Sequence, residues 1–399
     1  MPFIKTGFKY LGYALLWLLV AVSLAVVIVP PFLDRIYYQG PVSGHYDGAR
    51  FFNTDEGQGE WVNDPVGRNN KRPRSFFILR WITGNDDRQP WPESVAVATA
   101  TPAKLDKLKP GEMRATWIGH ATVLIETPGF TMLTDPIWSE RAGPWGILGP
   151  KRVTAPGIAL EDLPKIDLVV VSHNHYDHLD LATLKKLWER DKPAIVTSLG
   201  NDSIINGIGV PSLPMDWGAN RKVGKATVHV TRNHHWGSRW FKDRNRALWS
   251  SFTVDTPSGS VFFAGDTGYG DGKWPGEAAA AAGGPIRLAI IPIGAFRFGP
   301  GQMWTGSHIG PHHAVKVFEG LNAHYGLPIH WGTFQLSSEA RETPPKMLAL
   351  EAACAGLAPD AFAAKAIGTP FMVPEVGEPK LPASAPKPVC DKAAIEALP

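Results

Sequence analysis

The chain has 399 residues, of which 44% are hydrophobic and 19% are charged, and its formal net charge is +3. This length is sufficient for a large globular domain, and so small an excess of positive charge does not indicate a nucleic-acid-binding groove. The two cysteines, Cys354 and Cys390, lack C-x-x-C spacing. Because this spacing is absent, the two cysteines do not indicate a zinc knuckle or a dithiol redox motif.

An apolar segment without charged side chains, Leu11–Pro30, follows a short N-terminus, residues 1–10. Twenty residues at 1.5 Å each form a helix of about 30 Å, the thickness of a bilayer's hydrocarbon core. The apolar run continues through Val26–Val29, beyond the small residues Ser23–Ala25, so we favour an uncleaved transmembrane signal anchor over a cleaved signal peptide. The positive-inside rule then predicts residues 1–10 in the cytoplasm and the remaining chain outside it, in the periplasm of a bacterium.

Residues 39–110 contain many turn-forming and aromatic residues and no long periodic segment. We expect them to form an N-terminal arm that packs on the domain rather than a domain of their own. The aromatic segments Phe51–Asn53 and Phe76–Leu79 are expected to attach this arm to the domain surface.

Residues 111–369 are predicted to form one domain, because no linker interrupts their pattern of short strands and amphipathic helices. The predicted strands are Thr122–Glu126, Phe130–Leu133, Ile166–Val171, Ala226–Thr231, Ser251–Asp255, Ser260–Ala264 and Arg287–Ile293. The predicted helices are Leu181–Glu189, Pro311–Gly320 and Pro345–Ala355. This order agrees with an α/β/β/α sandwich, in which ligands gather on loops along one edge of the paired sheets. The Pro-rich residues 370–399 are predicted to form an extended tail.

The most informative segment is Ser172–Asp180, which reads S-H-N-H-Y-D-H-L-D directly after a predicted buried strand. Its last residue is a good N-cap for the helix that follows. Alternation at the strand end points His173 and His175 in the same direction, while Asp177 and His178 can face a second point nearby. Imidazole nitrogens and carboxylate oxygens are the ligands of a catalytic zinc-type centre.

The H-x-H-x-D-H string resembles the signature of the metallo-β-lactamase superfamily. Five further segments come in the matching order: Trp117–Thr122, Leu133–Ile137, Asn233–Trp236, Ala264–Tyr269 and Ile329–Phe334. Together they resemble the branch that contains N-acyl-phosphatidylethanolamine phospholipase D and its bacterial relatives. The resemblance covers roughly residues 45–370 and implies the α/β/β/α fold with a dinuclear centre of two Zn²⁺ or similar divalent ions.

The resemblance also implies seven metal ligands, which are His173, His175 and His235 for one ion, Asp177, His178 and His330 for the second, and Asp266 as a bridge between them. His235 is preferred to His234 because the family's ligand directly precedes a tryptophan. His308 lies where the family has a pocket histidine. The candidate catalytic residues are therefore Asp177, Asp266 and His308. For His308, the expected role is to contact phosphate or to act as an acid, and the alternative is a solvated loop histidine.

Two other polar residues, Asp135 and His120, are candidates for supporting roles. Asp135 is placed to accept the free N–H of a ligating histidine, and His120 is a similar support, with an ordinary structural hydrogen bond as the alternative for both. His312 and His313 lie in the first turn of a predicted helix and are expected at the surface.

The chain has no G-x-S-x-G elbow, no P-loop and no G-x-G-x-x-G after a strand. We therefore expect catalysis to depend on the bound metal ions. The resemblance implies that a metal-bound hydroxide cleaves a membrane-lipid phosphodiester. The first alternative is a hydrolase of lactones or small carboxylic esters, and the second is a non-catalytic membrane-anchored protein. A lipid enzyme also needs an apolar groove, for which Arg74–Trp91 and Pro144–Leu148 are the candidate walls.

The two cysteines allow one further prediction. An extracytoplasmic domain permits disulfides, so Cys354 in the last predicted helix can bridge to Cys390 in the tail. Two unpaired thiols are the alternative.

Overall fold

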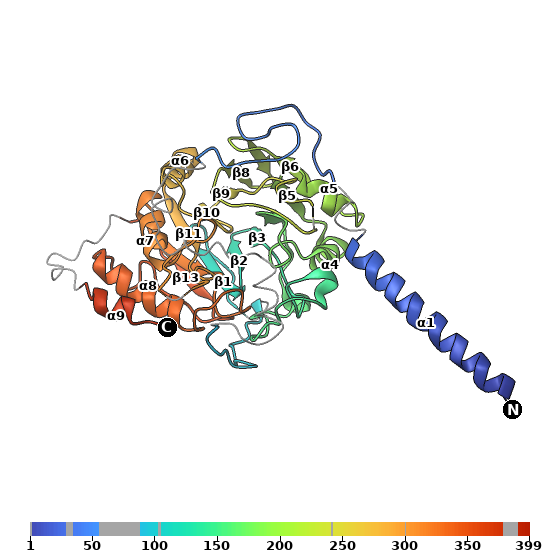
Figure 1. Cartoon of the computed structure of the whole chain (residues 1–399). Coiled ribbons are helices and arrows are strands. Elements are labelled where there is room, and N and C mark those ends of the chain that lie inside the picture. The colour runs from blue at the N-terminus through green and yellow to red at the C-terminus, as the bar shows by residue number, and fades with distance from the viewer. Residues whose placement is uncertain are drawn as a thin grey trace.

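The computed structural model of the chain describes residues 2–28, 35–55, 88–102, 105–240, 242–299, 301–377 and 390–399. Two β-sheets lie face to face in the domain, and helices cover their outer faces (Figure 1). The first sheet has the order β13-β1-β2-β3-β4-β5-β6, formed by Phe371–Val373, Met113–Gly119, Thr122–Thr127, Phe130–Thr134, Leu168–Val171, Ala194–Ser198 and Leu213–Met215. The second has the order β12-β11-β10-β9-β8-β7, formed by Tyr325–Ile329, Ile286–Pro292, Gly259–Phe263, Ser251–Thr256, Ala226–Thr231 and Asn220–Val223.

Strand β4 shows why some strands are apolar at every position. Leu168 and Val170 point into the core between the two sheets, whereas Val169 and Val171 point outward into a second core. All four side chains are fully buried. Successive strand residues face opposite sides, so a strand covered on both sides reads as a continuous apolar run.

Helices complete the outer layers. On the first sheet, α4 (Leu181–Asp191) buries Leu184 and Leu187 against the outward side chains of β3 and β4, and α5 (Asn201–Asn206) packs near β5 and β6. The second sheet is covered by α6, α7 and α8, which span Trp274–Ala281, Pro311–Gly320 and Thr343–Cys354. The predicted α/β/β/α sandwich is therefore confirmed, and each predicted strand and helix occurs with its ends shifted by no more than a few residues.

The tail is less extended than predicted. Phe371–Val373 forms β13, which pairs with β1 in antiparallel register, and the Arg287 guanidinium donates to the Val373 carbonyl at 2.6 Å. Near the C-terminus, Lys392–Glu396 forms helix α9, and Cys354 is bonded to Cys390. Sheet pairing and a disulfide thus hold both described parts of this segment, and Pro379, Pro382, Pro386 and Pro388 lie outside the described residues.

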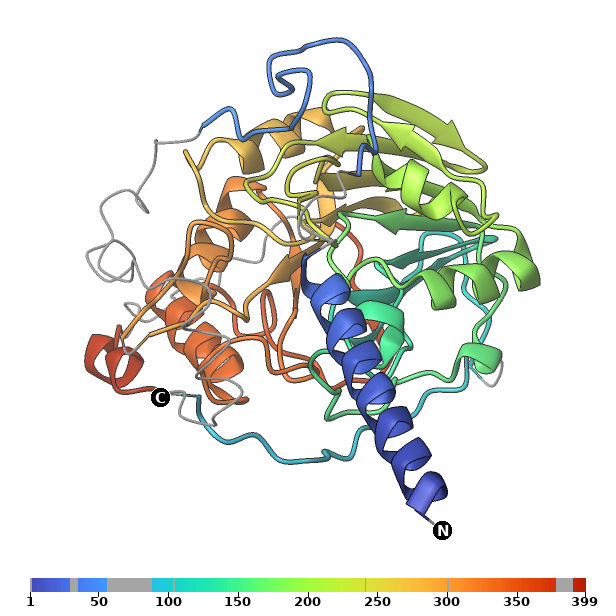
Figure 2. The ribbon, with the colours of Figure 1, turned by 45° about the vertical axis from the view of Figure 1, so that its right-hand side comes forward.

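The N-terminal segments differ in how they meet the domain. Helix α1 (Pro2–Ile28) extends away from the sheets (Figures 1 and 2), and it is long and apolar enough to cross a membrane, a test that a signal sequence also passes. Within residues 35–55, Tyr46 and Phe51 are buried against Leu248 and Trp249, which confirms the attachment predicted for Phe51–Asn53. The segment Phe76–Leu79 lies outside the described residues.

Candidate metal centre

The histidine-rich loop turns sharply between β4 and α4. The His175 carbonyl accepts the backbone N–H groups of His178 at 3.1 Å and Leu179 at 2.9 Å, which closes the turn. Asp180 then caps α4, because its Oδ1 accepts the N–H groups of Ala182 and Thr183. These bonds satisfy donors that a helix start otherwise leaves unpaired, and they fix the loop that carries four of the seven predicted ligands.

The other three predicted ligands follow strand ends in the second sheet: His235 comes after β8, Asp266 after β10 and His330 after β12. Gly265 explains how the Asp266 loop approaches the histidine-rich loop. Its φ of 61° suits glycine, and a Cβ placed there would lie 2.6 Å from the Cβ of Ser172.

Four overlapping groups of potential ligands form at this edge, each with ligand atoms within 4.8 Å of one another, and the two largest contain four residues each. The first consists of His173, His175, His235 and Asp266, and the second of His120, Asp177, His178 and His330. All seven residues expected from the sequence are thus brought together, and His120 joins them.

The first group converges on the ring of His175. The His173 Nε2 lies 2.8 Å from His175 Nδ1, and the His235 Nε2 lies 3.3 Å from the same atom. His235 is held in this orientation because its Nδ1 donates to the Ser307 carbonyl at 2.9 Å. Burial lowers the pKa of all three imidazoles, and that of His175 falls to about 3. The three rings are therefore neutral, which is the form that binds metal ions.

Asp266 connects the two groups. Its Oδ2 lies 3.2 Å from His178 Nε2 and 3.9 Å from His235 Nε2, and its Oδ1 lies 3.1 Å from His330 Nε2. Burial alone would lower the pKa of His330, but Asp266 and Asp177 raise it to about 9. The carboxylates of Asp177 and Asp266 thus strongly favour a positive charge between them and His330.

The donor set fits a metal ion. Within the described part of the chain, six buried side-chain atoms of this cluster have no hydrogen-bond partner: His120 Nδ1, His175 Nε2, His178 Nε2, both ring nitrogens of His330 and the Oδ1 of Asp266. Buried polar atoms left without partners are costly. A cation among these nitrogen and oxygen donors would satisfy them.

Two buried residues orient the cluster from behind. Asp135 lies 2.6 Å from His178 Nδ1 and also accepts the N–H and hydroxyl of Ser172, which confirms its predicted support of a histidine. His120 Nε2 lies 2.8 Å from Asp177 Oδ2. Burial lowers the pKa of His120 to about 3, so a neutral ring donates its N–H to the carboxylate.

We expect Asp135→Asn to weaken metal binding roughly 10–100-fold, because His178 loses the acceptor that fixes its ring orientation. Competition with a chromophoric chelator measures this affinity, and circular dichroism checks the fold. Asp162→Asn, which removes an exposed carboxylate, is the matched control. Wild-type affinity in a folded Asp135→Asn protein would show that Asp135 has no orienting role.

The N-terminal arm also holds the centre, which the sequence did not reveal. Asn53 donates to the His235 carbonyl at 2.9 Å and accepts the His235 N–H at 3.2 Å. Asp55 lies 2.7 Å from the Nδ1 of His234. His234 therefore turns toward the arm, and His235 faces the cluster. These contacts join residues about 180 positions apart, and no local motif signals them.

The remaining histidines divide between the site and the helical layer. His308 Nδ1 lies 3.7 Å from Asp266 Oδ2, and burial lowers the pKa of His308 to about 4, so it is not a solvated loop residue. The surface expectation is wrong for His313, which is fully buried and stacks on Tyr269 with centroids 4.5 Å apart. His313 packs against the rings of Tyr269 and Trp304, whereas its neighbour His312 stays partly exposed beside Glu351.

Comparison with known proteins agrees with this geometry. The chain is 34% identical over 242 residues to an uncharacterised protein of Mycobacterium tuberculosis, a match that covers 59% of this chain and 63% of that protein. It is 36% identical over 245 residues to N-acyl-phosphatidylethanolamine-hydrolyzing phospholipase D 1 of Caenorhabditis elegans, covering 58% and 67%. The chain thus spans about two thirds of the length of these curated relatives.

A solved structure and a family model agree on the fold. The crystal structure of a possible metal-dependent hydrolase from Veillonella parvula superimposes with a TM-score of 0.51 at 14% identity, covering 65% of this chain and 99% of that one. The sequence model of the beta-lactamase superfamily domain matches residues 131–331, half of the chain. That segment contains all seven predicted ligands, and the chain belongs to the beta-lactamase superfamily.

Proposed function

We propose that the protein is a dinuclear zinc hydrolase that cleaves a membrane-lipid phosphodiester in the manner of a phospholipase D. The observation that carries the proposal is the pair of ligand groups that meet at Asp266. A single carboxylate between two histidine clusters suits two ions that share one ligand. The seven residues act as the ligands expected from the sequence.

When bound, two divalent ions supply Lewis acidity and a water whose pKa falls from about 16 toward about 7. The protein's own residues set the geometry around that chemistry. Asp266 fixes the separation of the two ligand groups, and Asp177 is oriented by His120. His308 borders Asp266 with a partly exposed ring, from which an N–H can donate to a phosphoryl oxygen of the substrate.

Two relatives support a lipid substrate, because the proteins from C. elegans and Saccharomyces cerevisiae are both named N-acyl-phosphatidylethanolamine-hydrolyzing phospholipases D. Helix α1 supports it independently. As an uncleaved single-pass anchor it would hold the domain at the surface of a bilayer, on the extracytoplasmic side by the positive-inside rule. Other relatives are named only as metal-dependent hydrolases, which keeps the lactone or ester hydrolase as the competing assignment.

A paired assay tests the proposal. The full chain in mixed micelles should hydrolyse N-acyl-phosphatidylethanolamine, with water adding to phosphorus and the bond to the ethanolamine oxygen breaking, to give phosphatidic acid and N-acylethanolamine. Simple lactones are offered to the same preparation, and Asp266→Ala provides the blank for both. If the enzyme ignores the lipid and opens lactones efficiently, the phospholipase assignment is wrong and the lactonase assignment replaces it.

A further inference from the structure

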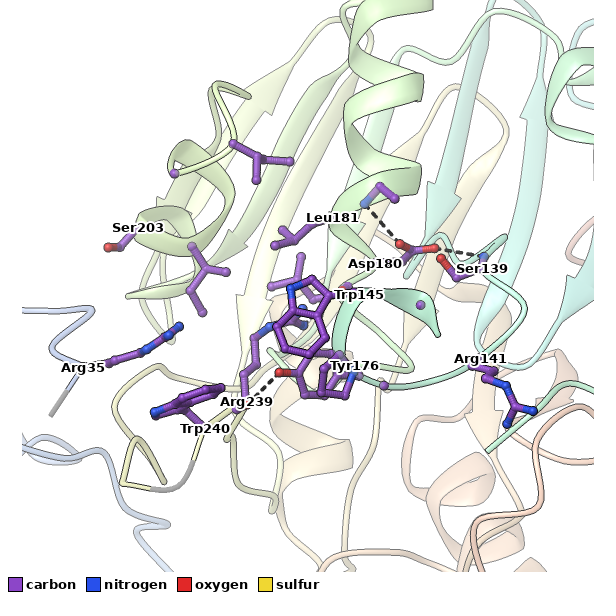
Figure 3. A pocket seen from close by; sticks show the side chains of 18 of the residues that line it. Arg35, Ser139, Arg141, Trp145, Tyr176, Asp180, Leu181, Ser203, Arg239 and Trp240 are labelled. Carbon is purple, nitrogen blue, oxygen red and sulfur yellow. Dashed lines mark hydrogen bonds between the residues drawn. The ribbon is translucent and has the colours of Figure 1, made fainter. Parts of the chain in front are cut away.

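A pocket of about 700 Å³ lies beside the metal loop and includes none of the seven predicted ligands among its lining residues. Its walls come from the segment after α1, the loop before η4 (Pro144–Gly146), the start of α4, and α5 (Figure 3). Tyr176, Leu179 and Asp180 of the histidine-rich loop line it, and the Tyr176 hydroxyl donates to the Arg239 carbonyl at 2.7 Å. Apolar side chains form much of the surface, namely Trp145, Leu181, Ile204, Ile208 and Trp240.

Two of the pocket's three arginines, Arg35 and Arg141, carry positive charge that no carboxylate of the described residues pairs with. The third is Arg239. The Arg35 guanidinium lies 4.4 Å from the Trp240 ring centroid, and the other two donate to backbone carbonyls. Among the described residues, none of the three forms an ion pair with a carboxylate.

The carboxylates of Asp180 and Asp243 stabilise the charge of Arg239, and Asp180, the single acidic residue of the lining, does not pair with Arg35 or Arg141. Asp180 is occupied by the N-terminus of α4 and by the backbone N–H of Ser139 at 3.0 Å. An anionic occupant would therefore complement the pocket, and the planar guanidinium groups suit phosphate oxygens.

The pocket also lies close to the end of the membrane-span candidate. Arg35 follows Ile28, the last residue of α1, by seven positions, and seven residues of extended chain reach at most about 25 Å. Trp145 lines the pocket, and Ile147 and Leu148 follow it in the same loop. These three side chains are 79%, 69% and 52% exposed. Exposed tryptophan near a membrane helix is typical of side chains at the bilayer interface.

We propose that this pocket binds an anionic phospholipid of the bilayer that α1 enters, with its phosphate at Arg35 beside Trp240 and the start of its acyl chains on the apolar wall, while Arg141 adds positive charge at the opposite side of the pocket (Figure 3). The site is separate from the metal centre, so the lipid is a ligand that docks the domain on the membrane rather than a substrate. Trp145, Ile147 and Leu148 enter the interface beside it. The inference goes beyond the proposed function; it rests on the membrane anchor proposed there but not on the proposed hydrolysis.

Native mass spectrometry of the full chain in a neutral detergent tests the site. The probe is an equimolar mixture of phosphatidylglycerol and phosphatidylcholine with identical acyl chains, offered to the wild type and to Asp266→Ala. Both proteins should retain more phosphatidylglycerol than phosphatidylcholine. Arg35→Gln and Arg141→Gln should each reduce that preference about fivefold, and the double variant should abolish it. Arg221→Gln, which removes an exposed arginine on β7 outside the pocket, is the matched control.

Each other outcome overturns the inference. Equal retention of the two lipids, or a preference that survives in the double variant, would show that the arginines bind no lipid phosphate. A preference lost in folded Asp266→Ala would place the lipid in the metal centre. Displacement of phosphatidylglycerol by inorganic phosphate alone would identify a free-phosphate site. Thermal melting of each variant confirms that it is folded, and Trp145→Ser provides a second variant if either arginine change prevents folding.

Discussion

We expect Asp266→Ala to lose about 10³-fold or more in kcat/KM and to lose bound metal as well. Asp266 belongs to the first ligand group, and its carboxylate lies 3.2 Å from His178 and 3.1 Å from His330 of the second. Without it the two groups have no common ligand, and the geometry on which metal-assisted hydrolysis depends is lost. Steady-state kinetics and elemental analysis on the same preparation measure the two losses together.

His308→Ala should be the milder change, because His308 borders the centre without belonging to either main ligand group. It should lower the rate while leaving the metal content near the wild-type value. Asp360→Ala, at an exposed position, controls for the loss of one carboxylate. A folded Asp266→Ala protein with wild-type metal content and rate would refute the bridging role, and so would a His308→Ala protein that is the more impaired of the two.

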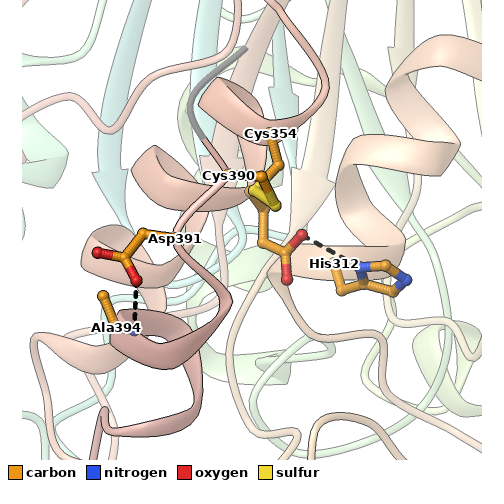
Figure 4. The surroundings of a disulfide bond; sticks show 6 residues. His312, Cys354, Cys390, Asp391 and Ala394 are labelled. Carbon is orange, nitrogen blue, oxygen red and sulfur yellow. Dashed lines mark hydrogen bonds and ion pairs between the residues drawn. A yellow bond between two sulfur atoms is a disulfide. The ribbon is translucent and has the colours of Figure 1, made fainter.

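We expect removal of the Cys354–Cys390 bond to lower the free energy of unfolding by about 3–4 kcal/mol in the chain-entropy model. The bond attaches the C-terminal segment to the end of α8 across 36 positions (Figure 4). Beyond it, Ile395 packs on Phe296 and Met347, so α9 is held by both the covalent bond and apolar contacts.

Urea unfolding of the Cys354→Ser, Cys390→Ser double variant measures this difference, and the wild type unfolded with and without reductant provides the matched comparison. Thiol labelling of the denatured, non-reduced chain should find no reactive cysteine. Two reactive thiols would exclude the bond, and a double variant as stable as the oxidised wild type would show that the apolar contacts of α9 suffice.

The sequence was informative where structure depends on local pattern. Strand β4 and the histidine-rich loop could be predicted because a two-sided core requires a continuous apolar run and because four of the predicted ligands lie within six positions. Asp180 was identifiable as a cap from its place before an amphipathic helix. His235, Asp266 and His330 lie far from that loop in the chain, and only the resemblance linked them to it.

Other features could not be read from local pattern. Strands β6, β7 and β13 lie at sheet edges, and β7 is largely exposed, so little apolar alternation marks them. Asn53 and Asp55 support the centre from a segment without regular structure. The burial of His313 depends on its packing against Tyr269 and Trp304, and its position in the first helical turn does not reveal this.

Elemental analysis of the full chain, purified in detergent without chelator and assayed for hydrolysis, tests the central claim most directly. The two ligand groups that share Asp266 predict about two zinc or similar divalent ions per chain in the active preparation. Stepwise removal by a chelator should abolish activity, and adding the metal back should restore it. A fully active preparation that contains one ion per chain, or none, would contradict the dinuclear centre.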